Sequence, residues 1–153
     1  MTNPEKHVEF IKHCALYVKE GLQKKYGYRP ENMMGKCIEA SDKLVYMLKH
    51  QGYSRVRAKQ VWVLYQNFES CSNYCFEEHW IVEVAYGEYK WYVDLTLEQF
   101  GWAFDFALPP IWIGTKLPTF MLTRKPGRDT LKRCGWTDWY NLGDYINNFE
   151  YKL

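Results

Sequence analysis

Residues 79–96 read HWIVEVAYGEYKWYVDLT and carry the strongest strand signal in the chain. Two runs rich in β-branched and aromatic residues flank Gly87 and Glu88, which is typical of two antiparallel strands joined by a two-residue turn. Glycine supplies the positive φ that such a turn needs at its first central position. Tyr86 is therefore expected to pair with Tyr89, and this pair sets the register of the whole hairpin.

The register of this hairpin predicts a histidine and an aspartate side by side. Counted outward from the turn, Ile81 faces Asp94. Two residues farther from the turn, His79 faces Thr96. Because side chains alternate along a strand, His79 and Asp94 share one face as diagonal neighbours, with their backbones roughly 7–8 Å apart. A slip of one residue would send Asp94 to the opposite face.

Two helices are expected before this sheet. The first covers residues 4–26, with Asn3 as its N-cap, and the second covers residues 37–50. A strand over residues 55–64 follows. Helices that precede an antiparallel sheet in a chain of this length predict one α+β domain over residues 1–153. The apolar residues of the first helix recur at helical spacing: Val8, Ile11, Ala15, Val18 and Leu22.

The rest of the chain gives weaker patterns. Residues 66–77, rich in Asn, Ser and Cys, predict a loop. Proline and glycine interrupt the chain repeatedly after residue 101, and a short helix is expected over residues 142–151.

Composition limits the class of protein. A hydrophobic content of 47% with 18% aromatic residues favours a packed globular domain over disorder. A net charge of +2 is too small to indicate nucleic acid or an anionic membrane surface, and no apolar run reaches membrane-spanning length. The absence of a signal-like N-terminus and an odd count of five cysteines predict a cytoplasmic protein, with secretion as an effector left open.

Cys37, His79 and Asp94 occur in the order and at the places that a thiol hydrolase requires. Cys37 begins a predicted helix, where the helix dipole and free backbone N–H groups stabilise a thiolate. Its own N–H is a candidate donor to an oxyanion, and Gly35 would let a substrate backbone pass close by. An imidazole takes the thiol proton and later protonates the leaving group, while a carboxylate orients the imidazole.

These residues resemble the papain-like and transglutaminase-like superfamily of cysteine enzymes. The matching pieces are residues 34–41 (MGKCIEAS), 79–84 (HWIVEV) and 91–96 (WYVDLT). Residues 94–100 (DLTLEQF) are similar to the ending of this motif in small bacterial members, including papain-fold toxin and deamidase domains. The resemblance covers residues 35–100 and implies N-terminal helices packed on an antiparallel β-sheet.

The resemblance also implies roles and partners. Cys37 would be the nucleophile, His79 the general base and acid, and Asp94 the orienting residue, without a metal or an organic cofactor. The implied reactions are proteolysis, glutamine deamidation, transamidation or acyl transfer on a protein or peptide, and a toxin would have an immunity or inhibitor protein. Papain-type enzymes place a Gln before the Cys for the oxyanion. The candidates for this role or for substrate contact are Gln23, Gln60, Trp80, Thr96 and Gln99.

Three other interpretations stay open. The scaffold could be a non-catalytic module that binds a partner through its aromatic surface, or an arylamine-type acyltransferase that uses a thioester cofactor. Cys71 and Cys75, spaced C-x3-C, suggest zinc, but no second pair at a matching spacing accompanies them. Loss of activity with retained binding in Cys37→Ala would favour an enzyme over a binding module.

Overall fold

The computed structural model describes residues 3–66, 74–104, 107–125 and 151–152. Two α-helices, α1 (Pro4–Tyr26) and α2 (Cys37–His50), are joined through the short 3-10 helix η1 (Pro30–Met33). Three strands follow, β1 (Arg55–Gln66), β2 (Tyr74–Tyr86) and β3 (Tyr89–Asp94). A second 3-10 helix, η2 (Leu97–Ala103), precedes the short strands β4 (Trp112–Gly114), β5 (Met121–Leu122) and β6 (Tyr151–Lys152).

Both predicted helices are confirmed. The Asn3 side chain accepts a hydrogen bond from the N–H of Glu5 at 3.0 Å and so caps α1, while Gly27 ends it with a φ of 108°. The five predicted apolar residues of α1 are all buried. In α2, Leu44 and Leu48 are fully buried in the same core.

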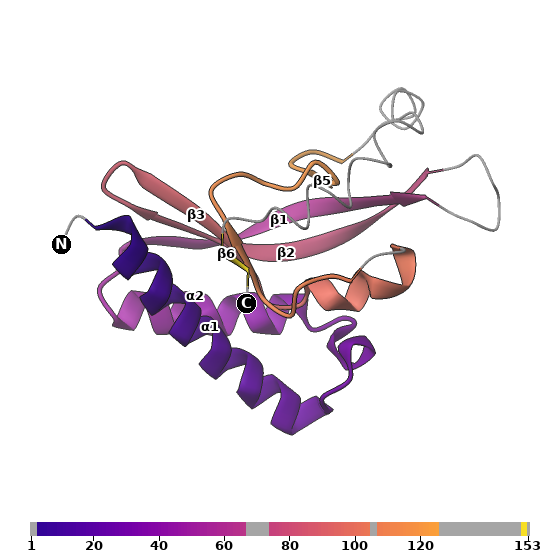
Figure 1. Ribbon diagram of the computed structural model, residues 1–153, viewed down its shortest axis with the longest axis horizontal. Coiled ribbons are helices and arrows are strands. Elements are labelled where there is room, and N and C mark those ends of the chain that lie inside the picture. Colours follow the sequence, from indigo (N-terminus) through magenta and orange to yellow (C-terminus); the bar gives the residue numbers. More distant parts are fainter. Residues whose placement is uncertain (1–2, 67–73, 105–106, 126–150, 153) are drawn as a thin grey trace.

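The strands form one curled antiparallel sheet in the order β5-β1-β2-β3-β4-β6. Figure 1 shows α1 and α2 lying on the same side of this sheet, so the architecture is the α+β arrangement that the sequence predicts. Among the described residues, none of the helices combines the length and the apolar character needed to cross a bilayer.

The predicted hairpin register is confirmed. Gly87 has a φ of 59°, and Tyr86 pairs with Tyr89. The ladder continues through Glu83 opposite Tyr92, and it ends where Val82 pairs with Val93. His79 lies just beyond this paired segment, at the place where β3 leaves β2.

The predicted loop over residues 66–77 is wrong at both ends. Residues 74–77 belong to β2, and they pair with β1 as far as Gln66. The aromatic residues in this stretch favour an extended backbone, and pairing with β1 satisfies its peptide groups. The helix predicted over residues 142–151 lies outside the described residues except at Tyr151, which belongs to β6.

The buried apolar residues form two clusters, and β2 contributes to both. Val82 and Val84 join the cluster beneath α1 and α2, whereas Ile81 joins a second cluster with Phe100 and Trp112. This division follows from the alternation of side chains along a strand. His79 has the same parity as Ile81 and belongs with the second cluster.

Candidate active site

His79 and Asp94 form a buried pair, as the hairpin register predicts. Both side chains are 0% exposed, and Nε2 of His79 donates to Oδ2 of Asp94 at 2.7 Å. This distance is typical of a charge-assisted hydrogen bond. The pair therefore fixes which imidazole nitrogen faces the carboxylate and which one stays available.

Asp94 is itself held by residues that follow it in the chain. Its Oδ1 accepts the backbone N–H of Thr96 at 2.9 Å. The amide of Gln99 donates to the Thr96 carbonyl at 2.9 Å and to the Thr96 hydroxyl at 3.0 Å. All three side chains are buried. Thr96 and Gln99 were predicted as candidates for substrate contact; in the structure Thr96 holds the carboxylate and Gln99 holds Thr96.

The second ring nitrogen of His79, Nδ1, is buried and has no hydrogen-bond partner among the described residues. Burial alone would lower the pKa of His79, but the charge and hydrogen bond of Asp94, together with the neighbouring Cys37 thiol, raise it to about 9. The imidazole is therefore protonated at neutral pH. Cys37 lies close enough to influence this pKa although no formed hydrogen bond joins the two side chains.

Cys37 is partly exposed at the first residue of α2. No side chain caps this helix, in contrast to α1, and its first internal hydrogen bond runs from the N–H of Ala40 to the carbonyl of Lys36. The N–H groups of the first turn consequently remain open to an anion. Two residues before Cys37, Gly35 has a φ of 75° and open space above its Cα atom.

The charged residues beside Cys37, Lys36 and Glu39, both interact with Tyr26. The ammonium of Lys36 lies 4.2 Å from the centroid of the Tyr26 ring. A hydrogen bond from the Tyr26 hydroxyl, aided by Lys43 and Lys25, lowers the pKa of Glu39. Because these cations offset the Glu39 carboxylate, it opposes a thiolate at Cys37 less than an unpaired carboxylate would.

Apolar groups shield the histidine and the aspartate from water. The Phe100 ring meets the His79 imidazole edge to face, with centroids 5.0 Å apart. Trp112 of β4 is 1% exposed and lies directly opposite Asp94 in the sheet. Sequence reasoning did not assign either residue to the site. Phe100 lies in the stretch that carries the resemblance, but the position of Trp112 depends on a three-residue strand that left no periodic pattern.

The remaining predicted residues lie elsewhere. Gln23 is in α1, and Gln60 of β1 pairs with Trp80 of β2. Strand alternation turns Gln60 and Trp80 to the face of the β1–β2 pair opposite to His79. Among the described residues, no hydrogen bond joins either glutamine to the His79–Asp94 pair.

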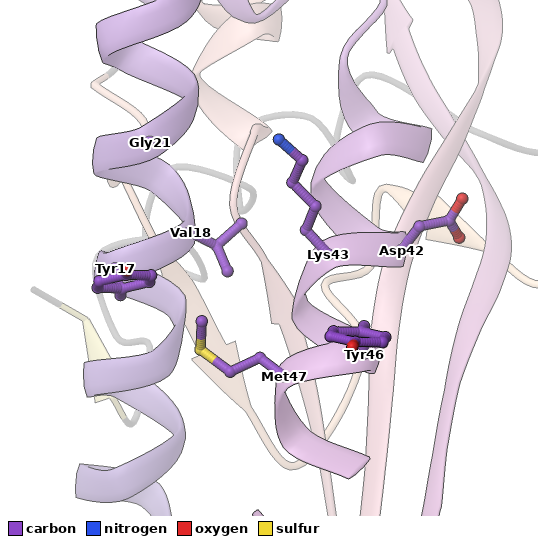
Figure 2. A pocket seen from close by; sticks show the side chains of 7 residues that line it. All are labelled: Tyr17, Val18, Gly21, Asp42, Lys43, Tyr46 and Met47. Carbon is purple, nitrogen blue, oxygen red and sulfur yellow. The ribbon is translucent and has the colours of Figure 1, made fainter. Parts of the chain in front are cut away.

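A groove between the two helices and the arrangement of possible metal ligands are also relevant to ligand binding. Figure 2 shows an apolar groove between α1 and α2, with Tyr17 and Val18 on one helix and Tyr46 and Met47 on the other. Cys37, His79 and Asp94 do not line it. In the parts of the chain that the structure describes, no three His, Cys, Asp or Glu side chains are grouped to hold a metal ion. Cys71, part of the C-x3-C spacing, lies outside those parts.

No family model matches this chain, and no curated protein or solved structure is similar to it at a significant level.

Proposed function

We propose that this chain is a cysteine-dependent amide hydrolase or acyltransferase of the papain-like and transglutaminase-like type. The observation that carries the proposal is the buried Nδ1 of His79, beside the Cys37 thiol. It lacks a hydrogen-bond partner in the part of the chain that the structure describes, while Nε2 is held by Asp94. A buried polar atom without a partner costs roughly 1–3 kcal/mol. An exchangeable proton between Cys37 and His79 explains why the chain tolerates this cost.

The proposed reaction begins from the thiolate of Cys37, whose proton is held on Nδ1 of the His79 imidazolium. The thiolate sulfur attacks the amide carbon, and a tetrahedral intermediate forms. Its C–N bond then breaks, the imidazolium gives its proton to the departing amine or ammonia, and a thioester remains on Cys37. Water attacks the thioester in hydrolysis, or a second amine attacks it in transfer, and either attack regenerates the thiol.

The start of α2 supplies a site for the negative oxygen of the intermediate. The N–H of Cys37 and its neighbour in the first turn lack a capping side chain. Donors fixed before the reaction stabilise developing charge most effectively, and removing one such donor costs about 3–4 kcal/mol in the barrier of a well-studied hydrolase. With these backbone donors, neither Gln23 nor Gln60 is needed to bind the oxyanion.

The proposal includes a class of substrate and a location. Glutamine side-chain amides and peptide bonds in proteins are the favoured substrates, which makes the chain a deamidase, a transglutaminase-like enzyme or a protease. It would act in the cytoplasm of its own cell or, as a toxin or effector, in that of another. In the second case an inhibitor protein would protect the producing cell.

The pH dependence of cysteine alkylation tests the proposal. Iodoacetamide is applied across a range of pH, and each cysteine is followed by peptide mass spectrometry. We expect Cys37 to react rapidly well below its ordinary titration range near pH 8.5, because a protonated His79 stabilises the thiolate. Cys14 serves as the internal reference, since burial raises the pKa of its thiol.

Two variants make this test specific. His79→Ala should remove the rapid reaction of Cys37, whereas His50→Ala, at an exposed histidine of α2, should leave it unchanged. If Cys37 reacts like an ordinary thiol in the wild type, the enzyme proposal fails. The non-catalytic binding module then becomes the better explanation, and retained partner binding in Cys37→Ala would support it.

A further inference from the structure

The face of the sheet that carries His79 and Asp94 also carries a basic surface. Residues directly opposite one another on β1, β2 and β3 form rows across this face. The rows nearest the β2–β3 turn hold Arg55, Ala85 and Lys90 in the first, Arg57, Glu83 and Tyr92 in the second, and Lys59 with Ile81 in the third. We call Arg55, Arg57, Lys59 and Lys90 the basic rows.

Positive charge in the basic rows exceeds the negative charge beside them. Glu83 lies between its cations with a side chain only 11% exposed, 3.1 Å from Arg57 and 3.8 Å from Lys59. Arg55 donates instead to the carbonyl of Gly87. Strand β1 contains no carboxylate, and between residues 79 and 90 the hairpin has only Glu83 and Glu88. Within the described residues, Lys90 has no ion pair.

Three of the four cations of the basic rows are open to solvent, whereas the Lys59 side chain is 20% exposed. Arg55 and Lys90 are exposed, and the Arg57 side chain is 64% exposed. Together with Glu83 and Ala85 these residues line a hollow in the sheet surface. The second hydrophobic cluster covers the same face farther along, around Val61 and His79, and does not include the basic rows.

The rows lie along the same strands as the candidate active site and lead toward it. Val61 and His79 lie opposite each other one row beyond Lys59 and Ile81. At about 3.3 Å per residue, Glu83 is roughly 13 Å from His79 along β2, and the row of Arg55 and Lys90 is roughly 20 Å away. An extended polypeptide of about four to six residues spans this distance.

We infer that the basic rows bind an acidic segment of the protein substrate while Cys37 attacks an amide elsewhere in the same protein. This inference rests on the proposed function, and it deepens that function by specifying a protein with acidic residues near the reacting amide. Charge complementarity selects the occupant, because the basic rows hold four cations and the Glu83 carboxylate pairs with two of them, Arg57 and Lys59. That carboxylate, and a net charge of only +2, disfavour the closely spaced phosphates of a nucleic acid.

Two thiol-reactive peptides test the inference. Both carry a chloroacetyl group joined through six neutral residues to a tail, which contains four glutamates in one peptide and four serines in the other. We expect the glutamate peptide to alkylate Cys37 about fivefold faster at low salt, an advantage within the range measured for exposed ion pairs. High salt should abolish this advantage because it screens exposed charges.

Lys90→Glu is the test variant, since Lys90 takes no part in the ion pairs of Glu83, and Arg55→Gln is its milder companion. Lys6→Glu, on the exposed side of α1, makes the same charge change away from the sheet. Lys90→Glu should erase the preference for the glutamate peptide, whereas Lys6→Glu should retain it. The rate with iodoacetamide should be the same in all variants.

The outcomes separate this inference from the proposed function. Rapid iodoacetamide alkylation of Cys37 without any preference between the peptides overturns the inference and leaves the proposed function standing. Slow alkylation by every reagent overturns the proposed function itself. If a thymidine oligonucleotide of equal charge competes more strongly than the free glutamate peptide, the surface binds nucleic acid and the inference is wrong.

Discussion

Asp94 determines the charge of His79, because its buried carboxylate is the principal group that opposes the effect of burial. In Asp94→Asn the negative charge disappears and burial remains. The pKa of His79 should therefore fall from about 9 to below its ordinary value near 6.5. NMR titration of the His79 ring measures this change, and Asp42→Asn, at an exposed position of α2, is the control. An unchanged midpoint in Asp94→Asn would exclude the assigned role.

Gln99 acts on the site through Thr96. Gln99→Met keeps the volume of the side chain but removes two buried hydrogen bonds, so urea unfolding should show a loss of about 1–3 kcal/mol. Alkylation of Cys37 should slow as well, because Thr96 without Gln99 holds the Asp94 carboxylate less firmly. Gln23→Met, in α1, should change neither quantity by a comparable amount. Equal effects of the two substitutions would mean that Gln99 has no particular connection to the site.

The sequence predicted that His79 and Asp94 would be neighbours, but it did not predict which residues surround them. Turn chemistry at Gly87 was sufficient to bring His79 beside Asp94, because a two-residue turn dictates the register on both sides. The contact of Phe100 with His79 depends on how the chain folds back after β3, and no local pattern specifies that path. Thr96 and Gln99 were recognised as candidates, but their hydrogen bonds become visible only once η2 is placed.

At the scale of elements, the sequence predicts the helices and strands that have a strong hydrophobic periodicity and misses those that are too short to have one. Both α1 and α2 have apolar residues at helical spacing, and their predicted bounds agree with the structure. Strands β4 and β5 have three and two residues, too few to show any alternation. They form because β3 and β1 offer unpaired edges to them, and this is a long-range effect.

Lys19 connects two of these elements, and its replacement should loosen the segment behind the site. This lysine of α1 is 3% exposed, and its ammonium donates to Glu98 of η2 at 2.5 Å and to the carbonyl of Pro110. Lys19→Met keeps the apolar stem but leaves Glu98 without its cation. We expect a loss of about 1–3 kcal/mol in the free energy of unfolding, since the Glu98 side chain remains partly exposed.

Hydrogen exchange shows which element of the fold the Lys19→Met substitution loosens. The amides of η2 should exchange faster in Lys19→Met, while those in the middle of α2 keep their protection. The exposed Lys24→Met, in the last turn of α1, is the matched control and should leave η2 unaffected. Unchanged exchange in η2 would show that Lys19 does not hold this element.

At the scale of the whole molecule, the site lies where the two hydrophobic clusters meet. Cys37 comes from a helix that packs in the first cluster, whereas His79 contacts Phe100 of the second. The geometry of the thiol and the imidazole therefore depends on both clusters being assembled. It also follows that the charge on His79 contributes to the stability of the entire fold.

The protonated state of His79 should make stability depend on pH in a specific window. Its pKa is about 9 in the folded chain and near 6.5 when unfolded, so the native state binds the extra proton. The contribution is complete below pH 6.5 and is lost as pH rises through 9, on the order of 3 kcal/mol in all. Urea unfolding between pH 6 and 9.5 measures this loss, and His79→Gln should flatten the curve over that window. A wild-type stability that stays constant or increases across it would contradict a protonated His79 and, with it, the ion pair on which the proposed chemistry depends.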